Sequence, residues 1–227
     1  MRVKVVVFGP SGLIGDGFVR ESLRAEDVTE VVTVGRGPLA ATHPKHRHLV
    51  HGDFLDFDAL SGELAGVDAC FWALGVTSMG MSPADYERVT HDYTVAAVRT
   101  LAAVNPGLTF VYLSGAGTDG TERGRSRWAR VKGRTENAVI GAFPRGYALR
   151  PAFVLPAHAK RSKTRVYRWG TAAVIPFAPL LRRLSGAAVT DTAQLGRVGL
   201  HLARHGHERR VWENRDIVAL ATADPGA

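Results

Sequence analysis

Three glycines at intervals of three residues follow an apolar run near the N-terminus. They belong to the segment Gly9-Pro10-Ser11-Gly12-Leu13-Ile14-Gly15, which comes directly after the β-branched run Val3–Phe8. A strand, a tight turn and a helix in this order present free N–H groups and a positive dipole to an anion such as a pyrophosphate. The spacing differs from G-x-G-x-x-G and an ordinary turn is the alternative, but the position favours nucleotide binding. The candidate binding residues are Gly9, Ser11, Gly12, Leu13, Ile14 and Gly15.

Arg36 is the residue that would choose between the two nicotinamide dinucleotides. It ends the segment Val34-Gly35-Arg36, directly after the second predicted strand, Val31–Val34. A carboxylate at this point would bind the adenine ribose hydroxyls, whereas arginine accommodates a 2′-phosphate. No carboxylate stands here, so the sequence favours NADP over NAD as cofactor, although an ordinary surface arginine is the alternative.

Two further predicted strands end in residues suited to the same ligand. Asp53 and Phe54 follow the strand predicted at His48–His51 and would lie near the adenine. Ala73, Leu74 and Gly75 stand at the end of the strand predicted at Asp68–Leu74, where small residues let the backbone approach a ribose. These five residues complete the candidate cofactor-binding set in this half of the chain.

Short motifs follow most of the predicted strands. They are GPSGLIG, VGR, GDF, ALG, Leu113-Ser114-Gly115, Trp128–Gly133 and Leu149-Arg150-Pro151. This set resembles the short-chain dehydrogenase/reductase superfamily, in its atypical and extended branches. RVTHDY (88–93), WARVKGRTENAV (128–139) and VWENRDIVAL (211–220) are similar to the Tat-interacting-protein group, relatives of the NmrA-like proteins. The resemblance covers nearly the whole chain and implies an NAD(P)-binding Rossmann fold.

The resemblance also implies a reaction centre made of a serine, a tyrosine and a lysine four residues after the tyrosine. There the phenolate exchanges a proton with the substrate, the ammonium lowers the tyrosine pKa and holds the nicotinamide ribose, and the serine orients the substrate. Ser114 and Lys132 match this pattern, but Trp128 stands at the tyrosine position. Taken singly, a turn serine and a solvated helix lysine are the alternatives. Ser114, Lys132 and Trp128 are the candidate catalytic residues, and Lys132 also a candidate cofactor-binding residue.

The elements that must position these residues alternate between strand and helix. Helices are predicted at Gly12–Leu23, Pro83–Val104 and Ser126–Ala142. Strands are predicted at Val3–Phe8, Val31–Val34, His48–His51, Asp68–Leu74, Thr109–Leu113 and Gly146–Arg150. This alternation predicts an α/β fold over residues 1–150, a Rossmann-like doubly wound parallel sheet with right-handed crossovers.

Residues 151–227 are expected to form a small C-terminal extension that completes the same domain and shapes the substrate cleft. The pattern is looser here, with helices predicted near Val166–Leu184 and Thr192–Arg204 and a short strand at Arg210–Trp212. This stretch is too short for an independent domain, so we expect it to pack on the substrate side of the sheet.

Composition excludes several classes of protein. The 227 residues are 45% apolar and carry 29 basic against 21 acidic side chains, a net charge of +8, which is ordinary for a globular protein. The single cysteine, Cys70, excludes an internal disulfide or a Cys-rich zinc module. His43, His46, His48 and His51 lack metal-ligand spacing, so no metal site is predicted. No secretory signal pattern or long apolar run is present, and we expect a cytoplasmic protein without a membrane span.

The basic charge is concentrated in residues 121–183, which contain 15 basic and 2 acidic side chains. An acidic ligand or partner for this segment is the favoured interpretation, a solvated face is the alternative, and nucleic acid is disfavoured because no recognition motif accompanies the charge. The sequence thus predicts an NADP(H)-binding, epimerase-like oxidoreductase acting on a small carbonyl or alcohol. A non-catalytic dinucleotide-sensing regulatory protein with a protein partner is the alternative. The sequence identifies no substrate, partner or oligomeric state.

Overall fold

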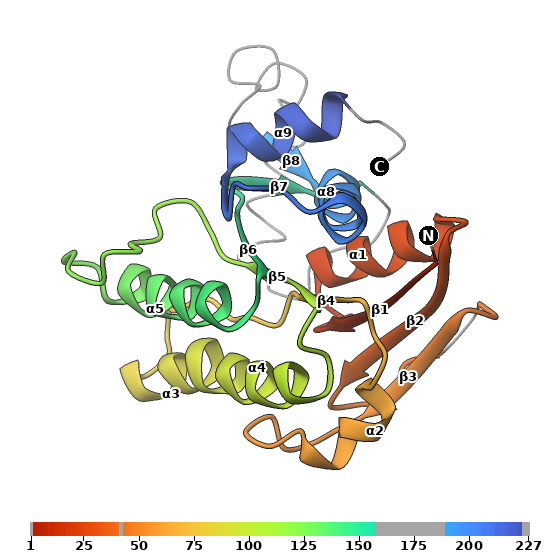
Figure 1. Cartoon of the computed structure of the whole chain (residues 1–227). Helices are drawn as coiled ribbons and strands as arrows, with labels where there is room; N and C mark the ends of the chain where they lie inside the picture. The colour runs from red at the N-terminus through yellow and green to blue at the C-terminus, as the bar shows by residue number, and fades with distance from the viewer. Residues whose placement is uncertain (1, 41–42, 158–188, 224–227) are drawn as a thin grey trace.

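Seven parallel strands form the central sheet of the computed structural model, which describes residues 2–40, 43–157 and 189–223. Their order across the sheet is β3-β2-β1-β4-β5-β6-β9 (Figure 1). The direction of winding reverses between β1 and β4, which is the point where ligands bind in open α/β sheets. The strands are β1 (Val3–Phe8), β2 (Val28–Gly35), β3 (His46–Val50), β4 (Ala69–Trp72), β5 (Thr109–Leu113), β6 (Arg145–Arg150) and β9 (Val211–Glu213).

Helices cover both faces of this sheet. Helices α1, α8 and α9 lie on one face, and α2, α4 and α5 lie on the other, which gives three layers (Figure 1). Two short strands, β7 (Phe153–Leu155) and β8 (Val189–Asp191), pair in parallel as a separate sheet. The helices are α1 (Leu13–Arg24), α2 (Ser61–Leu64), α3 (Pro83–Glu87), α4 (Tyr93–Val104), α5 (Arg127–Ala142), α8 (Thr192–His205) and α9 (Asn214–Ala223). No helix among the described residues is long and apolar enough to cross a membrane.

The central strands are buried on both faces, as their β-branched sequence predicts. In β1 only Lys4 is exposed. Val5 and Val7 pack with Phe18 of α1, and Phe18 stacks on Phe71 of β4 at 4.8 Å between ring centroids. The alternate residues of β1 face the helices of the opposite layer. Burial on both faces holds β1 rigidly, and the glycine segment begins where this strand ends.

Glycines bring α8 unusually close to α1. A Cβ atom on Gly17 of α1 would lie 2.5 Å from the carbonyl oxygen of Thr192. A Cβ atom on Gly199 of α8 would lie 2.7 Å from a ring carbon of Phe18. Arg204 of α8 also forms a two-pronged ion pair with Asp27, and the hydrogen bond from this arginine lowers the pKa of the Asp27 carboxyl. Helix α8 therefore packs directly against the helix that the glycine segment opens.

The predicted doubly wound sheet is confirmed. The predicted strands correspond to β1 to β6 and β9, and the helix predicted at Thr192–Arg204 corresponds to α8. The long helix predicted at Pro83–Val104 is divided by a π-helical turn at Arg88–Asp92. Sequence patterns gave no indication of this turn, of the β7–β8 pair or of α9, because short elements carry little periodic signal. The helix predicted at Val166–Leu184 lies outside the described residues.

Candidate functional site

The predicted cofactor-binding residues meet at the carboxyl edge of the parallel sheet. Across the sheet, Asp53 and Phe54 follow β3, Arg36 follows β2, and the glycine segment follows β1. Ala73 to Gly75 follow β4, and Ser114 follows β5. The structure thus brings segments that are far apart in sequence to the same edge of the sheet.

The glycine segment packs so closely that side chains are excluded at two of its three glycines. Gly9 has a φ of +75°, and a Cβ atom there would lie 2.8 Å from the carbonyl oxygen of Ala73. A Cβ atom on Gly15 would overlap the carbonyl oxygen of Gly9. Gly12 differs, because its φ of −72° suits any residue and its nearest neighbour, the oxygen of Gly9, would be 3.3 Å away. Gly9 and Gly15 therefore build the turn, whereas Gly12 leaves space beside it.

That space lies at the N-terminus of α1. Gly12 is the N-cap of this helix and offers no side chain to bond the N–H groups of the first turn. Its own N–H donates to the oxygen of Gly9 at 3.0 Å, which tightens the turn. The first N–H groups of a helix have no intrahelical acceptor and carry the positive end of the dipole, so this N-terminus suits a pyrophosphate.

The groups predicted to lie near the adenosine differ in their exposure. Arg36 is exposed and forms no ion pair with any described residue, so its guanidinium is available to a ligand. Asp53 is also exposed, and one of its carboxylate oxygens accepts the N–H of Leu55 at 2.9 Å. The Phe54 ring is buried with Phe57, so only its backbone remains at this edge. A 2′-phosphate at this edge would therefore meet the guanidinium of Arg36. Phe54 instead has a packing role, which its sequence position did not indicate.

Ser114 lies in the first position after β5 and is buried, with 7% of its surface exposed. Its N–H donates to the oxygen of Leu149 on β6 at 2.8 Å, which continues the sheet by one residue. Its Oγ lies 2.9 Å from the Thr118 hydroxyl, which donates to the oxygen of Gly115 at 2.7 Å. Because that donation uses the Thr118 proton, the Ser114 hydroxyl donates to Thr118. Thr118 orients Ser114, and sequence reasoning missed this partner.

Lys132 of α5 is a buried titratable group whose surroundings shift its pKa. Burial lowers its pKa from 10.5 to about 8, and the nearby Glu136 carboxylate opposes the shift. Its ammonium lies 5.6 Å from the centroid of the Tyr112 ring, within the range of a cation–π contact. The lysine is therefore close to losing its proton at neutral pH, unlike the solvated helix lysine that the sequence left open.

Trp128 of α5 stands beside the loop that follows β5. Its indole ring would lie 3.5 Å from a Cβ atom on Gly117, a glycine with a φ of +82°. None of the tyrosines among the described residues places a phenol where the resemblance would put the tyrosine. Three are buried, with 1–4% of their surface exposed, and Tyr93 packs on Phe54 at 5.7 Å between rings. The three buried tyrosines are Tyr86, Tyr112 and Tyr147, and burial raises the pKa of the first two.

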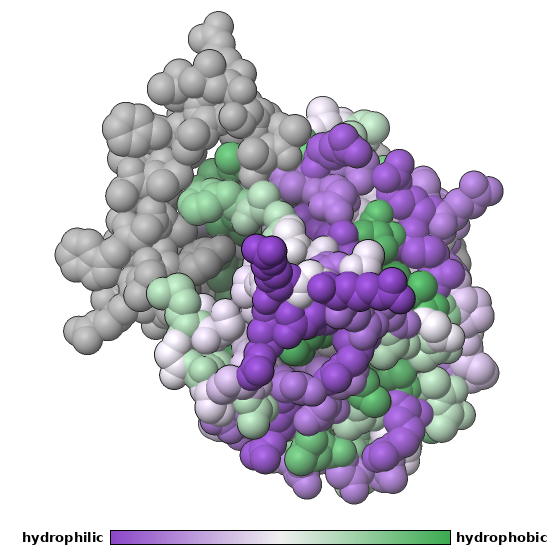
Figure 2. Space-filling view, turned by 90° about the vertical axis from the view of Figure 1, so that its left-hand side faces the viewer, coloured by the Kyte–Doolittle hydropathy of each residue, from purple (hydrophilic) through white to green (hydrophobic). Residues whose placement is uncertain are grey.

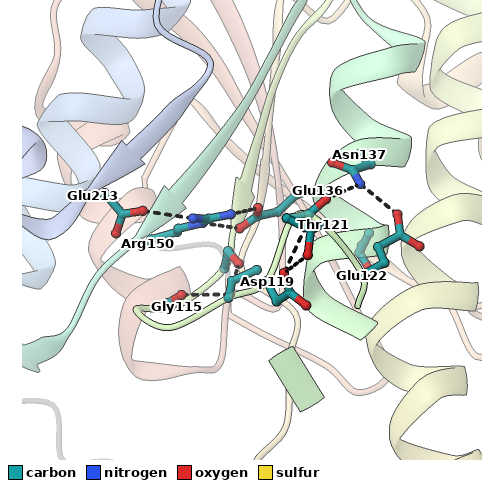
Figure 3. Close-up of polar contacts among 12 residues, drawn as sticks. Gly115, Asp119, Thr121, Glu122, Glu136, Asn137, Arg150 and Glu213 are labelled. Carbon is teal, nitrogen blue, oxygen red and sulfur yellow. Dashed lines mark hydrogen bonds and ion pairs between the residues drawn. The ribbon is translucent and has the colours of Figure 1, made fainter. Parts of the chain in front are cut away.

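A buried ion pair ties α5 to the end of the sheet (Figure 3). Both carboxylate oxygens of Glu136, which is 1% exposed, accept hydrogen bonds from Arg150 at 2.9 and 2.5 Å. A third nitrogen of Arg150 donates to Glu213 of β9 at 2.9 Å. The two carboxylates raise the pKa of Arg150 above its ordinary value. Glu136 stands four residues after Lys132, so this pair fixes the helix face that carries the lysine.

The loop between β5 and α5 is held in place from both sides (Figure 3). The Asp119 carboxylate accepts hydrogen bonds from the Thr121 hydroxyl at 2.6 Å, from the N–H of Gly124 at 2.6 Å and from the N–H of Thr121 at 3.0 Å, and these bonds lower its pKa. A Cβ atom on Gly133 of α5 would overlap the Asp119 carbonyl. Asn137 donates to the oxygen of Gly120 at 3.0 Å. The motif Asp-x-Thr-x-x-Gly suggests a turn, but its contacts with α5 could not be read from sequence.

The histidines near β3 have partners within the protein. His46 and His48 flank the hydroxyl of Thr33, at 2.9 and 2.8 Å. His51 donates from Nε2 to the carbonyl oxygens of Asp53 and Asp56 at 2.6 and 2.7 Å. Within residues 2–40, 43–157 and 189–223, no group of three His, Cys, Asp or Glu side chains is placed to hold a metal ion.

Solved structures share this architecture. No protein-family model and no curated protein sequence matches the chain. The enzyme WbmF of Bordetella bronchiseptica, in complex with NAD+, superposes with a TM-score of 0.68 at 16% identity, over 99% of this chain and 79% of that one. An oxidoreductase of the short-chain dehydrogenase/reductase family from Burkholderia thailandensis gives 0.68 at 15% identity, over 99% and 97%. Uronate dehydrogenase from Agrobacterium tumefaciens gives 0.67 at 14%, over 94% and 76%.

Identities this low establish the fold alone. The chain has the Rossmann fold found in short-chain dehydrogenase/reductase structures, as its motifs predicted. Its closer similarity to the Tat-interacting-protein group stays a prediction.

The lowered pKa of Lys132 predicts that the protein becomes more stable as the pH rises from about 8 to 10.5. In this window the unfolded chain keeps a proton that the folded protein has released, so the free energy of unfolding increases. Relative to Lys132→Met, which cannot titrate, the wild-type protein should gain at most about 3 kcal/mol. Urea denaturation of both proteins below pH 8 and near pH 10.5 measures this gain. An identical pH dependence in the two proteins would contradict the lowered pKa.

Proposed function

We propose that the protein is an NADP(H)-binding oxidoreductase of the short-chain dehydrogenase/reductase superfamily, acting on a small carbonyl compound or alcohol. The observation that carries the proposal is the alignment of the glycine segment, Arg36 and Ser114 along one edge of the sheet, with Lys132 of α5 over the Tyr112 ring of β5. The likeness to structures crystallised with NAD+ or NADH supports a nicotinamide dinucleotide. The exposed Arg36, with no carboxylate beside it at the end of β2, favours the 2′-phosphorylated form.

Each of these residues has a defined task in the proposed function. The first turn of α1 binds the pyrophosphate, Arg36 binds the 2′-phosphate, and Lys132 holds the nicotinamide ribose. Ser114, whose hydroxyl proton is directed at Thr118, accepts a hydrogen bond from a substrate hydroxyl. The dinucleotide, when bound, supplies or accepts the hydride. The proton must come from the chain, from water or from the substrate.

Trp128 leaves the proposed reaction without the usual side chain for proton transfer to or from the substrate. Indole is a hydrogen-bond donor only and forms no phenolate, so it does not act as the acid or base that the superfamily's tyrosine provides. The remaining sources of a proton are Ser114, a water held by Lys132, another side chain or the substrate itself. Because general acid–base help contributes about 10²–10⁴-fold to a rate, we expect slow or narrow turnover.

A non-catalytic, dinucleotide-sensing regulatory protein is the second candidate. It is favoured by one observation, that none of the four tyrosines among the described residues offers an exposed phenol beside Ser114. The two candidates share the cofactor site and differ in turnover. Reduction of a carbonyl by the wild-type protein therefore decides between them.

An acidic ligand for the basic middle segment is a further part of the proposal. A pocket of about 480 Å³ lies between α3 and the first two turns of α5, and it is lined by Arg127, Arg130, Arg134, Glu87 and Glu122, among others. Figure 2 looks onto this side of the molecule and shows hydrophilic side chains gathered around a hollow. The two glutamates are already bonded, Glu87 to Arg134 and Glu122 to Asn137.

The arginines of this pocket retain unused donors. Arg127 is exposed and forms no ion pair with any described residue, and the buried Nε of Arg134 has no partner among them. Ser126, the N-cap of α5, makes no capping hydrogen bond, and the first turn of the helix contains no acidic residue. An anion here would meet a cation and a free helix N-terminus together.

The first prediction from the proposed function concerns the cofactor. NADPH should raise the melting temperature more than NADH at equal concentration, because a ligand stabilises the folded state by mass action. Arg36→Asp should reverse this order, since a carboxylate repels the 2′-phosphate and accepts from ribose hydroxyls. Gly12→Val, which fills the space beside the turn, should abolish both shifts while the unliganded protein keeps its fold. Equal shifts for NADPH and NADH in the wild-type protein would refute the role of Arg36.

The second prediction concerns the reaction centre. Trp128→Tyr should leave NADPH affinity intact and raise carbonyl reduction by up to about 10²–10⁴-fold, because it restores a phenol next to Lys132. Lys132→Ala should weaken NADPH binding. Titration with NADPH and its oxidation with a panel of carbonyl compounds measure both effects. Tyr147→Phe is the control, because it removes a phenol whose hydroxyl is bonded to the His207 backbone and not to Ser114, so the rates should stay unchanged. Fast wild-type turnover that disappears in Trp128→Tyr would place the indole in a working substrate pocket instead.

The third prediction tests the arginine-lined pocket. With saturating NADPH present to fill the glycine site, inorganic phosphate should raise the melting temperature of the wild-type protein and raise it less in Arg127→Gln. Arg99→Gln removes the same charge from the exposed side of α4 and should behave as wild type. If the two variants respond alike, phosphate binds elsewhere and the pocket is an ordinary solvated groove.

A further inference from the structure

A chain of hydrogen bonds runs from the interior of β2 to the loop that carries Arg36. The hydroxyl of Thr33, a fully buried residue, lies 2.9 Å from Nε2 of His46 and 2.8 Å from Nδ1 of His48. Nε2 of His48 then lies 2.9 Å from the carbonyl oxygen of Gly37. One side chain of β3 therefore connects the core of β2 with the residue directly after Arg36.

The direction of these bonds follows from the carbonyl, which only accepts. Nε2 of His48 must carry the proton that it donates to Gly37, so in the neutral ring Nδ1 is an acceptor. The Thr33 hydroxyl donates to that nitrogen and in turn accepts from Nε2–H of His46. Every member of the chain then has a partner, and the tautomer of His48 is fixed by its neighbours.

The segment around Arg36 needs such support. Arg36 stands between Gly35 and Gly37, and glycine gives the backbone more conformational freedom than any other residue. A Cβ atom on Gly35 would lie 3.4 Å from a ring carbon of His48 and 3.9 Å from the Pro10 ring in the glycine segment. The N–H of His51 donates to the oxygen of Gly35 at 2.9 Å, which holds the first of the two glycines. His48 Nε2 holds the second.

We propose that His48 is a positioning residue for cofactor specificity, because its bond to Gly37 holds the Arg36 backbone where the guanidinium meets a 2′-phosphate. This inference rests on the proposed function and extends it from Arg36 to a residue that never touches the ligand. A loop anchored at both glycines presents Arg36 with less entropy to lose on binding. The effect is confined to the 2′-phosphate, so it should change NADPH affinity and leave NADH affinity unaltered.

Two substitutions of His48 separate the roles of its nitrogens. His48→Gln places an amide nitrogen near the position of Nε2 and keeps a donor for Gly37, whereas His48→Asn keeps only an acceptor for Thr33. The specificity ratio of each variant is its dissociation constant for NADH divided by its dissociation constant for NADPH, so a weaker preference for NADPH lowers the ratio. We expect His48→Asn to weaken NADPH about 3- to 10-fold, the range for loss of one hydrogen bond, and His48→Gln to lie close to wild type.

Controls distinguish positioning from general damage. His46→Asn removes the other histidine from Thr33 but leaves the bond to Gly37, so its specificity ratio should equal that of the wild-type protein. Thr33→Val removes the hydroxyl that orients His48 at nearly constant volume, and should lower the ratio as His48→Asn does. This second variant decides the matter if His48→Asn does not fold.

Three results would overturn the inference. A specificity ratio unchanged in His48→Asn or Thr33→Val, with the Arg36→Asp effect intact, refutes the positioning role but leaves the proposed function standing. An equal loss of NADPH and NADH affinity in His48→Asn means that the residue supports the fold only. A wild-type protein that binds neither dinucleotide refutes the proposed function and this inference together.

Discussion

The buried ion pair between Glu136 and Arg150 is the contact on which the candidate site depends. Removing two charges from water costs several kcal/mol for each ion, and only good geometry with every group bonded offsets that cost. Here both carboxylate oxygens and three guanidinium nitrogens are used, the last on Glu213. The pair therefore sets the rotation of α5 about its own axis, and with it the positions of Trp128 and Lys132 beside the end of β5.

The same pair explains the unusual state of Lys132. Glu136 is the acidic neighbour that would normally keep this lysine charged, but its negative charge is already compensated by Arg150. Burial then outweighs attraction, and the pKa falls to about 8. A lysine in this state holds and releases a proton near neutral pH. In the proposed function, in which Trp128 occupies the tyrosine position, Lys132 and Ser114 would be the groups left to organise a proton near the substrate.

Sequence reasoning located the sheet edge but not the contacts that make it rigid. The strand Val3–Phe8 and the glycine segment are local patterns, and the structure has them where they were predicted. The contact of Gly17 with Thr192 and the Glu136–Arg150 pair join segments far apart in the chain, and no local pattern encodes which partners meet. The π-helical turn at Arg88–Asp92 was missed for a different reason, since an element of five residues carries too little periodic signal to be recognised.

Binding and chemistry place different demands on this site. The proposed dinucleotide site is made of backbone, from the left-handed Gly9 to the uncapped N-terminus of α1, and its shape does not depend on the side chains of the proposed reaction centre. Proton transfer instead depends on one phenol, and at that position an indole ring packs beside Gly117. In the proposed function, the fold would therefore keep a cofactor site while its reaction centre lacks the superfamily's tyrosine. Catalysis with a different proton source and cofactor sensing without turnover are both built on that one scaffold, and Trp128 is the side chain on which the two diverge.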